Sequence, residues 1–420
     1  MSIGFDGKGQ KMIRYVLVGC GSRGINAYAK PIVKSFGESA ALVGVCDINS
    51  KRAEAVSEIC GKEIPAFSDF DEMLEKTKPD VVIVTTIDAT HHIYAIRAME
   101  NGCDVIIEKP LATTPEAALS IRDTAERTGR NARVTFNLRF SPVLLKIKQL
   151  VATGIIGEIH SVHFQWMLDT VHGADYFRRW HRERKNSGSL LVHKSTHHFD
   201  LVNWFIDDEP EAVNAFGTRR SYGKGRVEHG ERCLDCAYKA SCKYYYDIEK
   251  SAKRLYRDCE DVDGYYRDSC IFSENIDIED NLSVSVRYKR GAIMSYTLTA
   301  HSPYEGFNLV LNGALGRLEF TKYAVHGEDF SELARKEEIR VFKHSGEMLE
   351  IELPESEGTG HGGTDGKLLD NLINGYTDDP YSQMAGIRAG MSSIGIGMAA
   401  NISMNKNRQV TIRELYNNKF

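Results

Sequence analysis

The sequence has no long apolar run, and this absence limits where the protein can reside. No stretch of about eighteen or more consecutive apolar residues occurs in the 420-residue chain, so no membrane-spanning helix is predicted. The first residues, MSIGFDGKGQK, lack the apolar segment of a secretory signal. We therefore expect a cytoplasmic protein that has no membrane partner.

A large excess of basic residues is also missing. The chain has 53 Lys and Arg against 58 Asp and Glu, which gives a net charge of -5, and no stretch concentrates the basic residues. Proteins that bind a phosphate backbone need such a positive patch. Nucleic acid is therefore not expected as a partner.

Cysteines are too few, and odd in number, for a disulfide framework. There are nine in the chain, and Cys20, Cys46, Cys60 and Cys103 lie in or beside apolar stretches. This distribution favours buried free thiols in a reducing compartment.

Short β-branched runs alternate with helical patterns from Ile13 to about residue 138. Strands that are apolar on both faces and alternate with helices predict an α/β domain, a doubly wound parallel sheet of the Rossmann type, over 12–138. Pro31 falls inside the first helical pattern, so that helix should kink or restart there.

The pattern changes in the remainder of the chain, 139–420. Strand-like segments with one polar face recur, which predicts an α+β domain with a large, mostly antiparallel open sheet covered by helices. A polar, cysteine-rich insertion interrupts this domain at about 220–275. The exposed face of such a sheet favours a homo-oligomer, a dimer or a tetramer.

A glycine-rich loop follows the first predicted strand and opens a helix. Gly19-Cys20-Gly21-Ser22-Arg23-Gly24 is a complete G-x-G-x-x-G, and Asp47 ends the second strand. In this context the glycines permit a tight turn, approach to a pyrophosphate and close helix packing, while Ser22 and Arg23 open the helix. The pattern predicts a dinucleotide site.

Asp47 indicates which dinucleotide binds. A carboxylate here accepts hydrogen bonds from the adenosine ribose diol and repels a 2′-phosphate, which favours NAD over NADP. Lys51 and Arg52 follow closely and weaken that preference.

Several motifs occur in a recognisable order: the GCGSRG loop, DATHHIYAIRAMENG, Glu108-Lys109-Pro110, FNLRFSP and SGSLLVHKSTHHFDLVNWF. With these motifs, the sequence resembles the Gfo/Idh/MocA oxidoreductases, the family of glucose-fructose oxidoreductase and inositol dehydrogenase, over nearly the whole chain. The resemblance implies an NAD-dependent enzyme acting on a CH-OH group of a carbohydrate-like substrate.

The resemblance also implies the catalytic residues. Lys109 matches the lysine beside the nicotinamide, and His197 matches a histidine facing it across the substrate, with Asp200 three residues later. Where the family keeps an aspartate, this chain has His193, followed by Lys194. A histidine can take a hydroxyl proton at neutral pH, and a lysine can stabilise developing negative charge. His193 and His197 are four residues apart, so they should share one helix face.

Further residues are assigned on the same pattern. His91 and Glu108 are expected near the cofactor, although His91 could equally be a solvent-facing residue in the first turn of a helix. The loop VHGADYFRRWHRERKNSG is rich in aromatic rings and donors that suit a polyhydroxylated ring, although a charged surface loop would look similar. The histidines could also be satisfied polar residues under the sheet. The predicted substrate contacts are Arg139, Trp180, His181, Lys194 and His198.

The insertion contains a possible metal-binding pattern. Cys233-x-x-Cys236 lets two thiolates reach one ion, and Cys242 and Cys270 would complete a tetrahedral structural zinc site. Free thiols are the alternative, because the second half is not a C-x-x-C.

Three functions remain open from the sequence. The preferred one is hydride transfer between NAD and a secondary hydroxyl of a sugar, glycoside or inositol. The second is an NAD-dependent glycosidase that oxidises the sugar transiently, eliminates the aglycone and returns the hydride. The third is a non-catalytic dinucleotide-sensing protein, which would need the glycine loop but not Lys109 or His197.

Overall fold

A computed structural model describes residues 12–223, 228–324, 337–354, 363–375 and 378–419. Contacts within the chain divide the described residues into two compact units. The first holds the chain up to Phe140, the segment Asp247–Arg267 and the residues from 363 to Met391. The second holds the other described residues from Ser141 onward.

The first unit is built on a six-stranded parallel sheet. Its strand order is β3-β2-β1-β4-β5-β6, the doubly wound order expected from the alternating pattern. The central strands are apolar on both faces, and Val16, Leu17 and Val18 of β1 are buried. The strands are β1 (Ile13–Val18), β2 (Ala40–Cys46), β3 (Ala66–Phe67), β4 (Val81–Val84), β5 (Asp104–Ile107) and β6 (Ala132–Val134).

Helices cover this sheet, and their starts follow the sequence signals. Pro31 lies in the first turn of a helix that restarts after a π-helical stretch, as expected. Thr114 caps the helix that begins at Pro115 by accepting from the Ala117 N–H at 3.2 Å. The helices are α1 (Ser22–Gly24), η1 (Ile25–Ala29), α2 (Lys30–Ser35), α3 (Ser50–Cys60), α4 (Phe70–Thr77), η2 (Asp88–Thr90), α5 (His91–Glu100), α6 (Pro115–Thr128), η3 (Asn137–Phe140), α12 (Ile248–Ser251), η5 (Arg257–Cys259), α13 (Glu260–Asp263) and α15 (Thr364–Asn374).

Two late segments complete the first unit, which the sequence did not predict. Leu369 and Ile373 of α15 are buried in one apolar cluster with Tyr15, Leu17 and Val56. The segment Asp247–Arg267, which lies inside the predicted cysteine-rich insertion, also belongs to this unit. The predicted division into 12–138 and 139–420 therefore differs from the grouping of contacts.

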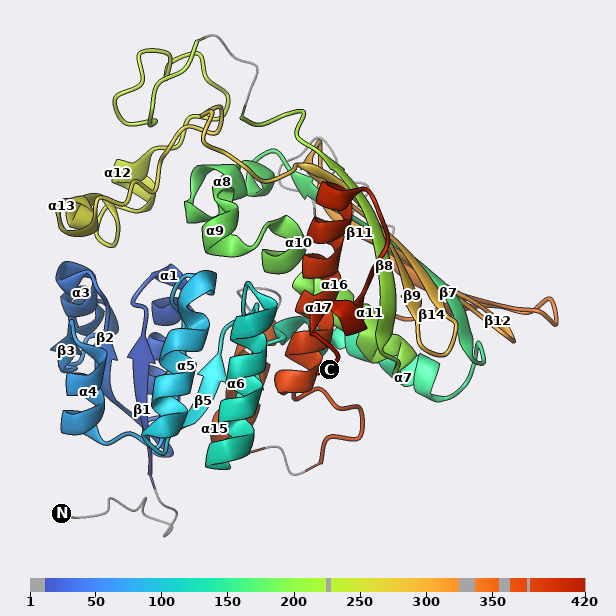
Figure 1. Cartoon of the computed structure of the whole chain (residues 1–420), viewed down its shortest axis with the longest axis horizontal. Coiled ribbons are helices and arrows are strands. Elements are labelled where there is room, and N and C mark those ends of the chain that lie inside the picture. Colours follow the sequence, from blue (N-terminus) through green and yellow to red (C-terminus); the bar gives the residue numbers. More distant parts are fainter. Residues whose placement is uncertain (1–11, 224–227, 325–336, 355–362, 376–377, 420) are drawn as a thin grey trace. The chain divides into compact units, whose positions relative to one another are not determined.

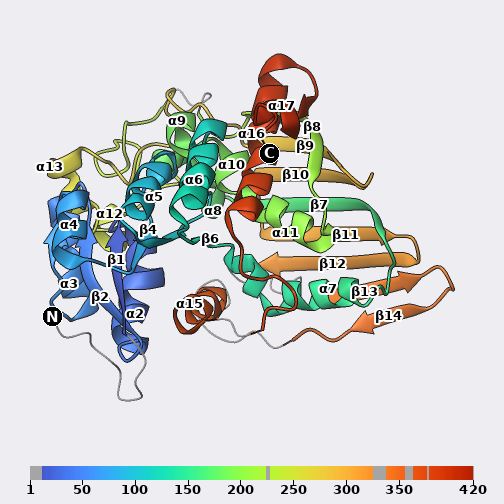
Figure 2. The ribbon, with the colours of Figure 1, turned by 60° about the horizontal axis from the view of Figure 1, so that its bottom comes forward.

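The second unit is built on a nine-stranded sheet. Its order is β14-β13-β12-β11-β7-β10-β9-β8-β15, and β7 pairs in parallel with β10 whereas the other neighbours are antiparallel (Figure 2). The predicted, mostly antiparallel sheet is confirmed. The strands are β7 (Ile159–Asp169), β8 (Pro210–Thr218), β9 (Asn281–Tyr288), β10 (Ile293–Ser302), β11 (Glu305–Gly313), β12 (Gly316–Ala324), β13 (Glu338–Lys343), β14 (Met348–Ile351) and β15 (Val410–Thr411).

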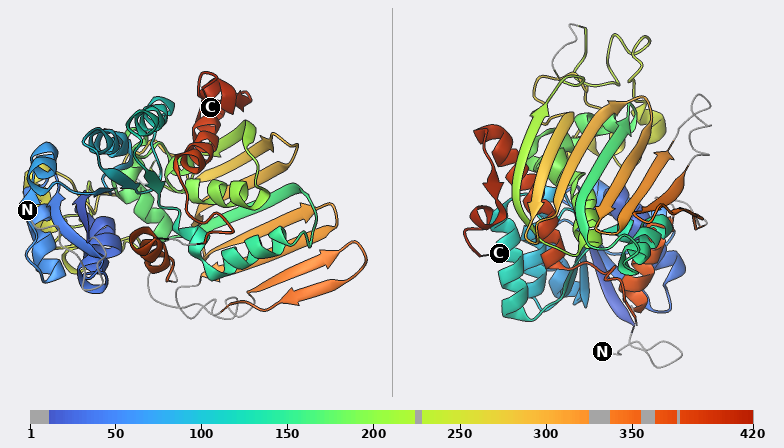
Figure 3. Two further views of the ribbon diagram at one scale, coloured as in Figure 1. Left: turned by 90° about the horizontal axis from the view of Figure 1, so that it is seen from below. Right: turned by 90° about the vertical axis from the view of Figure 1, so that its right-hand side faces the viewer.

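Side chains alternate across this sheet because successive residues of a strand point to opposite faces. Met294, Tyr296 and Leu298 of β10 are buried, whereas Ser295 and Thr297 between them are exposed. The right-hand view of Figure 3 looks onto the sheet, whose strands lie side by side.

The helices of the second unit are α7 (Pro142–Ala152), α8 (His172–Arg178), η4 (Trp180–Arg182), α9 (Arg184–Ser187), α10 (Leu190–His193), α11 (Thr196–Ile206) and α17 (Ile412–Leu415). The division between the units falls within α16 (Ile387–Lys406), after Met391. None of the helices in the described ranges is both long and apolar enough to cross a bilayer.

Candidate active site

The glycine loop between β1 and α1 has the geometry that its sequence predicts. Gly19 has φ +94°, and a Cβ there would lie 2.6 Å from the backbone of Thr85. A Cβ on Gly24 would lie 2.4 Å from the carbonyl oxygen of Gly19. Glycine is therefore needed at position 19 because the backbone after β4 lies close to it, and at position 24 because the loop's own backbone does.

Gly21 differs, because the protein leaves the space beside it open. The nearest atom to a Cβ built there is the Tyr256 hydroxyl oxygen at 3.5 Å, an ordinary contact distance. The absent side chain leaves room for a ligand next to the backbone N–H groups that begin α1, one of which, the Ser22 N–H, donates to the Tyr256 hydroxyl at 3.0 Å. This cradle fits the pyrophosphate of a dinucleotide.

Asp47 lies directly after β2, next to the glycine loop. Its carboxylate accepts from the backbone N–H of Cys20 at 2.7 Å and of Asn49 at 2.8 Å. Burial raises the pKa of this carboxyl, and the Arg52 guanidinium, whose Nη1 lies 3.3 Å from Oδ1, opposes that rise. The structure thus brings the predicted ribose-binding residue to the predicted phosphate-binding loop.

Arg23 and Glu108, both predicted to bind the cofactor, are joined to each other. Arg23 Nε lies 2.6 Å from Glu108 Oε1, and the Tyr28 hydroxyl donates to the same oxygen at 2.7 Å. The other side of the guanidinium donates to both oxygens of Asp365, at 2.7 and 2.9 Å. This network holds the start of α1 to the end of β5. Sequence reasoning missed Asp365, which is distant in the chain and carries no motif.

Lys109 follows β5, and His91 holds the peptide next to it. The ring of His91 is buried, with Nδ1 2.8 Å from the Pro110 carbonyl oxygen and Nε2 3.2 Å from that of Thr86. Burial lowers the pKa of this imidazole. His91 is therefore a positioning residue of the Lys109–Pro110 loop, and the solvent-facing alternative is wrong.

Arg139, predicted to contact substrate, is buried in the first unit. Its Nη1 donates to the Ser382 carbonyl at 2.6 Å, and its own carbonyl accepts from Gln383 Nε2 at 2.9 Å. Only 6% of the residue is exposed. This bond fixes one N–H group of the guanidinium, and the substrate contact of Arg139 stays a prediction, because the other N–H donors of an arginine can bind a further partner.

In the second unit, the aromatic loop predicted from the sequence forms a cluster of rings. Trp180 and His181 are stacked with centroids 3.7 Å apart, and His193 lies 4.2 Å from His181. The Tyr176 ring meets both histidines edge-on, at 5.5 and 5.6 Å. Three of the predicted residues, Trp180, His181 and His193, are thus brought together.

His193 and His197 do not share one helix, contrary to the expectation. α10 ends at His193 and α11 begins at Thr196. The helix breaks at Ser195, whose N–H donates to the Leu190 carbonyl at 2.9 Å. This bond spans five residues, whereas the bonds of an α-helix span four. The spacing of four residues therefore does not place the two rings on one helix face.

His198 lies in the core of the second unit. Its ring stacks on Trp166 at 4.0 Å, its Nδ1 lies 2.7 Å from the Tyr296 hydroxyl, and the residue has 0% exposure. The predicted substrate contact is therefore wrong for His198, which matches the alternative of a polar residue under the sheet. Lys194 and His197 are partly exposed, and Lys194 Nζ lies 5.2 Å from the Trp166 ring centroid.

The cysteines of the insertion do not form the predicted zinc site. Cys233, Cys236, Cys242 and Cys270 line one cavity of about 480 Å³, and all are free thiols. Yet among the described residues no three Cys, His, Asp or Glu side chains come together in a group that could hold a metal ion. Arg178 Nη1 lies 3.0 Å from Cys233 Sγ. The prediction of structural zinc is corrected to free thiols lining a cavity.

Comparisons with known proteins agree with this architecture. A model of an oxidoreductase family with an NAD-binding Rossmann fold matches residues 13–136. A model of the same family's C-terminal alpha/beta domain matches residues 148–412. YteT of Bacillus subtilis, named an oxidoreductase only provisionally, is 36% identical over 432 residues, which cover 96% of this chain and 99% of that protein.

Two further relatives have named ligands or substrates. D-glucoside 3-dehydrogenase of Escherichia coli is 37% identical over 119 residues, which are 28% of this chain and 34% of that enzyme. The crystal structure of the WlbA dehydrogenase of Chromobacterium violaceum, in complex with NADH and UDP-GlcNAcA, has a TM-score of 0.65 at 19% identity. That similarity covers 95% of this chain and 96% of the other.

The fold and the family matches define an oxidoreductase with an NAD(P)-binding Rossmann domain. The chain belongs to the Gfo/Idh/MocA family.

Proposed function

We propose that this enzyme transfers a hydride between NAD and a secondary hydroxyl of a carbohydrate-like substrate, a sugar, a glycoside or an inositol. The observation that carries the substrate class is the ring cluster of Tyr176, Trp180, His181 and His193. Aromatic faces pack on the C–H faces of sugar rings, and imidazole and indole N–H groups bond to hydroxyls. All four residues precede His197 in the chain, and the last of them, His193, ends the short helix α10.

Relatives with sugar chemistry support the proposal. One named relative is a D-glucoside 3-dehydrogenase, and others are inositol 2-dehydrogenases. Their matches cover about half of this chain or less, so they support a substrate class and not a particular sugar.

The proposed roles of the side chains follow from acid-base chemistry. NAD, when bound at the glycine loop, supplies the hydride acceptor. His197 takes the hydroxyl proton, since an imidazole has a pKa near neutral, and Lys109 stabilises the charge that develops on the oxygen. His91 holds the Lys109–Pro110 loop in place through its contact with the Pro110 carbonyl.

The proposal includes a preference for NAD over NADP. Asp47 is positioned beside the glycine loop, where its carboxylate suits a ribose diol and repels a 2′-phosphate. The measurement is the pair of dissociation constants for NADH and NADPH. Affinity for NADPH equal to or better than that for NADH would contradict this part of the proposal.

A substrate panel tests the reaction itself. The purified enzyme and NAD are incubated with free sugars, alkyl and aryl glycosides and inositols, and NADH absorbance and aryl alcohol release are followed together. We expect NADH to accumulate in proportion to substrate oxidised, without cleavage of the glycosidic bond.

The same assay separates the glycosidase alternative. His193 and Lys194 stand where the family pattern has an aspartate, and such groups could carry the second proton transfer that elimination requires. That cycle returns its hydride to the sugar. Sustained aryl alcohol release without NADH would replace the proposed function with the glycosidase.

A further inference from the structure

The segment Asp247–Arg267 of the first unit packs against the residues that follow β2. The Asn49 side chain donates to the Cys259 carbonyl at 2.8 Å, and the Arg52 Nε donates to the Leu255 carbonyl at 3.1 Å. In Figure 1, α13 of this segment is drawn above α3, the helix that begins after Asp47. This part of the insertion therefore borders the adenosine end of the dinucleotide site.

Two cations occupy the start of α3, and the segment supplies a carboxylate to each. Lys51 Nζ lies 2.8 and 2.6 Å from the two oxygens of Asp261. Arg52 Nη2 lies 3.0 Å from Asp263 Oδ2, while Arg52 Nη1 faces Asp47. The hydrogen bond from Lys51 lowers the pKa of the Asp261 carboxyl, so this pair is charged at neutral pH.

These cations matter because the acid that ends β2 is the point at which Rossmann enzymes distinguish the two cofactors. A nearby arginine accommodates the 2′-phosphate of NADP, and the guanidinium and ammonium groups are the side chains that bind phosphate. On sequence alone, Lys51 and Arg52 therefore argue for NADP. In the structure both are already engaged by carboxylates from a distant part of the chain.

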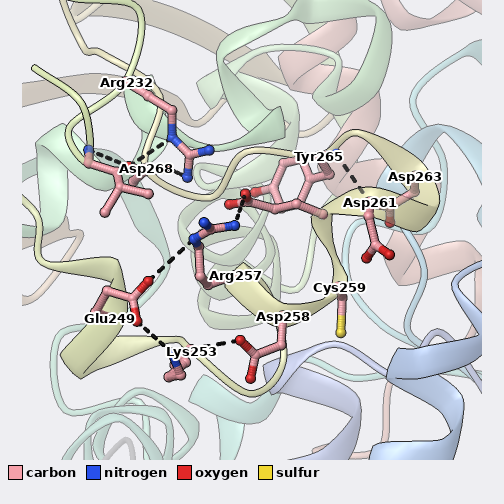
Figure 4. A network of polar contacts seen from close by, with 12 residues as sticks. Arg232, Glu249, Lys253, Arg257, Asp258, Cys259, Asp261, Asp263, Tyr265 and Asp268 are labelled. Atoms are coloured by element: carbon pink, nitrogen blue, oxygen red, sulfur yellow. Dashed lines mark hydrogen bonds and ion pairs between the residues drawn. The ribbon is translucent and has the colours of Figure 1, made fainter.

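The other cations of the segment have their own partners. Figure 4 shows Arg257 bonded to Glu249, and Lys253 bonded to both Glu249 and Asp258. Arg254 pairs with Glu58 of α3 at 2.8 Å. The same view shows Asp261 and Asp263 on one short helix, α13. That helix thus presents its two carboxylates to the two cations that follow β2.

We propose that Asp261 and Asp263 are specificity-determining residues that exclude NADP. They neutralise Lys51 and Arg52 and place two further negative charges near the position of a 2′-phosphate. The enzyme then distinguishes NAD from NADP in two ways: these carboxylates repel the 2′-phosphate of NADP, and Asp47 contacts the ribose of NAD. This inference rests on the proposed use of NAD and extends it to residues of the insertion.

The test removes these charges without changing the shape of the side chains. Asp261→Asn and the double variant Asp261→Asn/Asp263→Asn are prepared, and dissociation constants for NADH and NADPH are measured by fluorescence titration. We expect the ratio of the NADPH to the NADH constant to fall by about tenfold or more in the double variant, through loss of like-charge repulsion. The single variant changes an exposed ion pair, whose loss costs little stability, so it guards against misfolding of the double variant.

Glu249→Gln is the matched control. It removes one negative charge from the same segment, but Glu249 pairs with Lys253 at 2.6 Å and with Arg257 at 3.3 Å, which both belong to the segment itself. Its ratio should stay within about twofold of the wild type. The inference would be overturned if the single variant and the double variant both bind NADH and both keep the ratio of the NADPH to the NADH dissociation constant within twofold of the wild type. The proposed NAD preference fails separately, if the wild type itself binds NADPH as well as NADH.

Discussion

At the scale of single residues, one hydrogen bond joins the glycine loop to the acid after β2: the Cys20 N–H donates to the Asp47 carboxylate at 2.7 Å. Gly19, Gly21, Gly24 and Asp47 could be placed together because their motif has a fixed relation to a strand and a helix. The partners of Arg23 could not, because Asp365 lies far along the chain and a lone aspartate carries no pattern. His198 was misplaced because sequence spacing does not show which face of a helix is buried.

Lys109 carries the first prediction. Lys109→Met removes the ammonium group that is proposed to stabilise the substrate oxygen, while the glycine loop and Asp47 still bind the dinucleotide. We expect kcat to fall by about 10² or more, as for a lost acid-base or electrostatic group, with NADH affinity nearly unchanged. Steady-state kinetics and NADH titration measure the two effects. A loss in kcat below tenfold would show that another residue has this role.

His91 gives a prediction on pH. Its folded-state pKa is lowered by burial, while in the unfolded chain it titrates near 6.5. Below about pH 6.5 the unfolded state therefore binds a proton that the folded state does not. As the pH is lowered through this range, the free energy of unfolding falls by up to about 1.4 kcal/mol per pH unit. Above that pH the contribution of neutral His91 is fully present.

The variant His91→Gln tests this, because an amide cannot titrate. The thermal midpoint of the wild type should fall more steeply than that of the variant as the pH is lowered below about 6.5. Parallel curves for the two proteins would contradict a buried, neutral His91.

At the scale of elements, periodicity predicted both sheets, since strands that are apolar on both faces and strands with one polar face differ in their patterns. The π-helical stretch before Pro31 and the break between α10 and α11 were not predictable in detail, because both depend on backbone hydrogen bonds. The sequence also did not predict that Asp247–Arg267 belongs to the first unit. Its anchors are single polar contacts such as that of Asn49 with the Cys259 carbonyl.

Tyr256 provides a prediction for that segment. Its hydroxyl accepts from the Ser22 N–H at 3.0 Å, and this donor belongs to the helix start that binds a pyrophosphate. Cofactor binding must displace the hydroxyl, so Tyr256→Phe should tighten NADH binding. The expected gain is that of one net hydrogen bond, about 0.5–1.5 kcal/mol, or two- to tenfold. Weaker binding in the variant, measured by titration, would mean that the hydroxyl instead contacts the cofactor.

At the scale of the whole molecule, we propose a homo-oligomer. One face of the nine-stranded sheet is exposed, and it includes apolar side chains such as Phe216 on β8 and Ile293 on β10. A second copy would cover this face, and light scattering after size exclusion should give a dimer or a tetramer. A monomer at micromolar concentration would contradict the proposal.

In the proposed reaction, the hydrogen on the carbon of a secondary alcohol leaves a carbohydrate-like substrate as hydride and is transferred to NAD. The direct measurement uses glycosides and inositols that carry deuterium on their ring carbons. NADH is recovered after turnover, and its mass is measured by mass spectrometry. We expect NADH that carries one deuterium, in an amount equal to the ketone formed. Turnover of any of these substrates without deuterium in the recovered nicotinamide would contradict the proposed reaction.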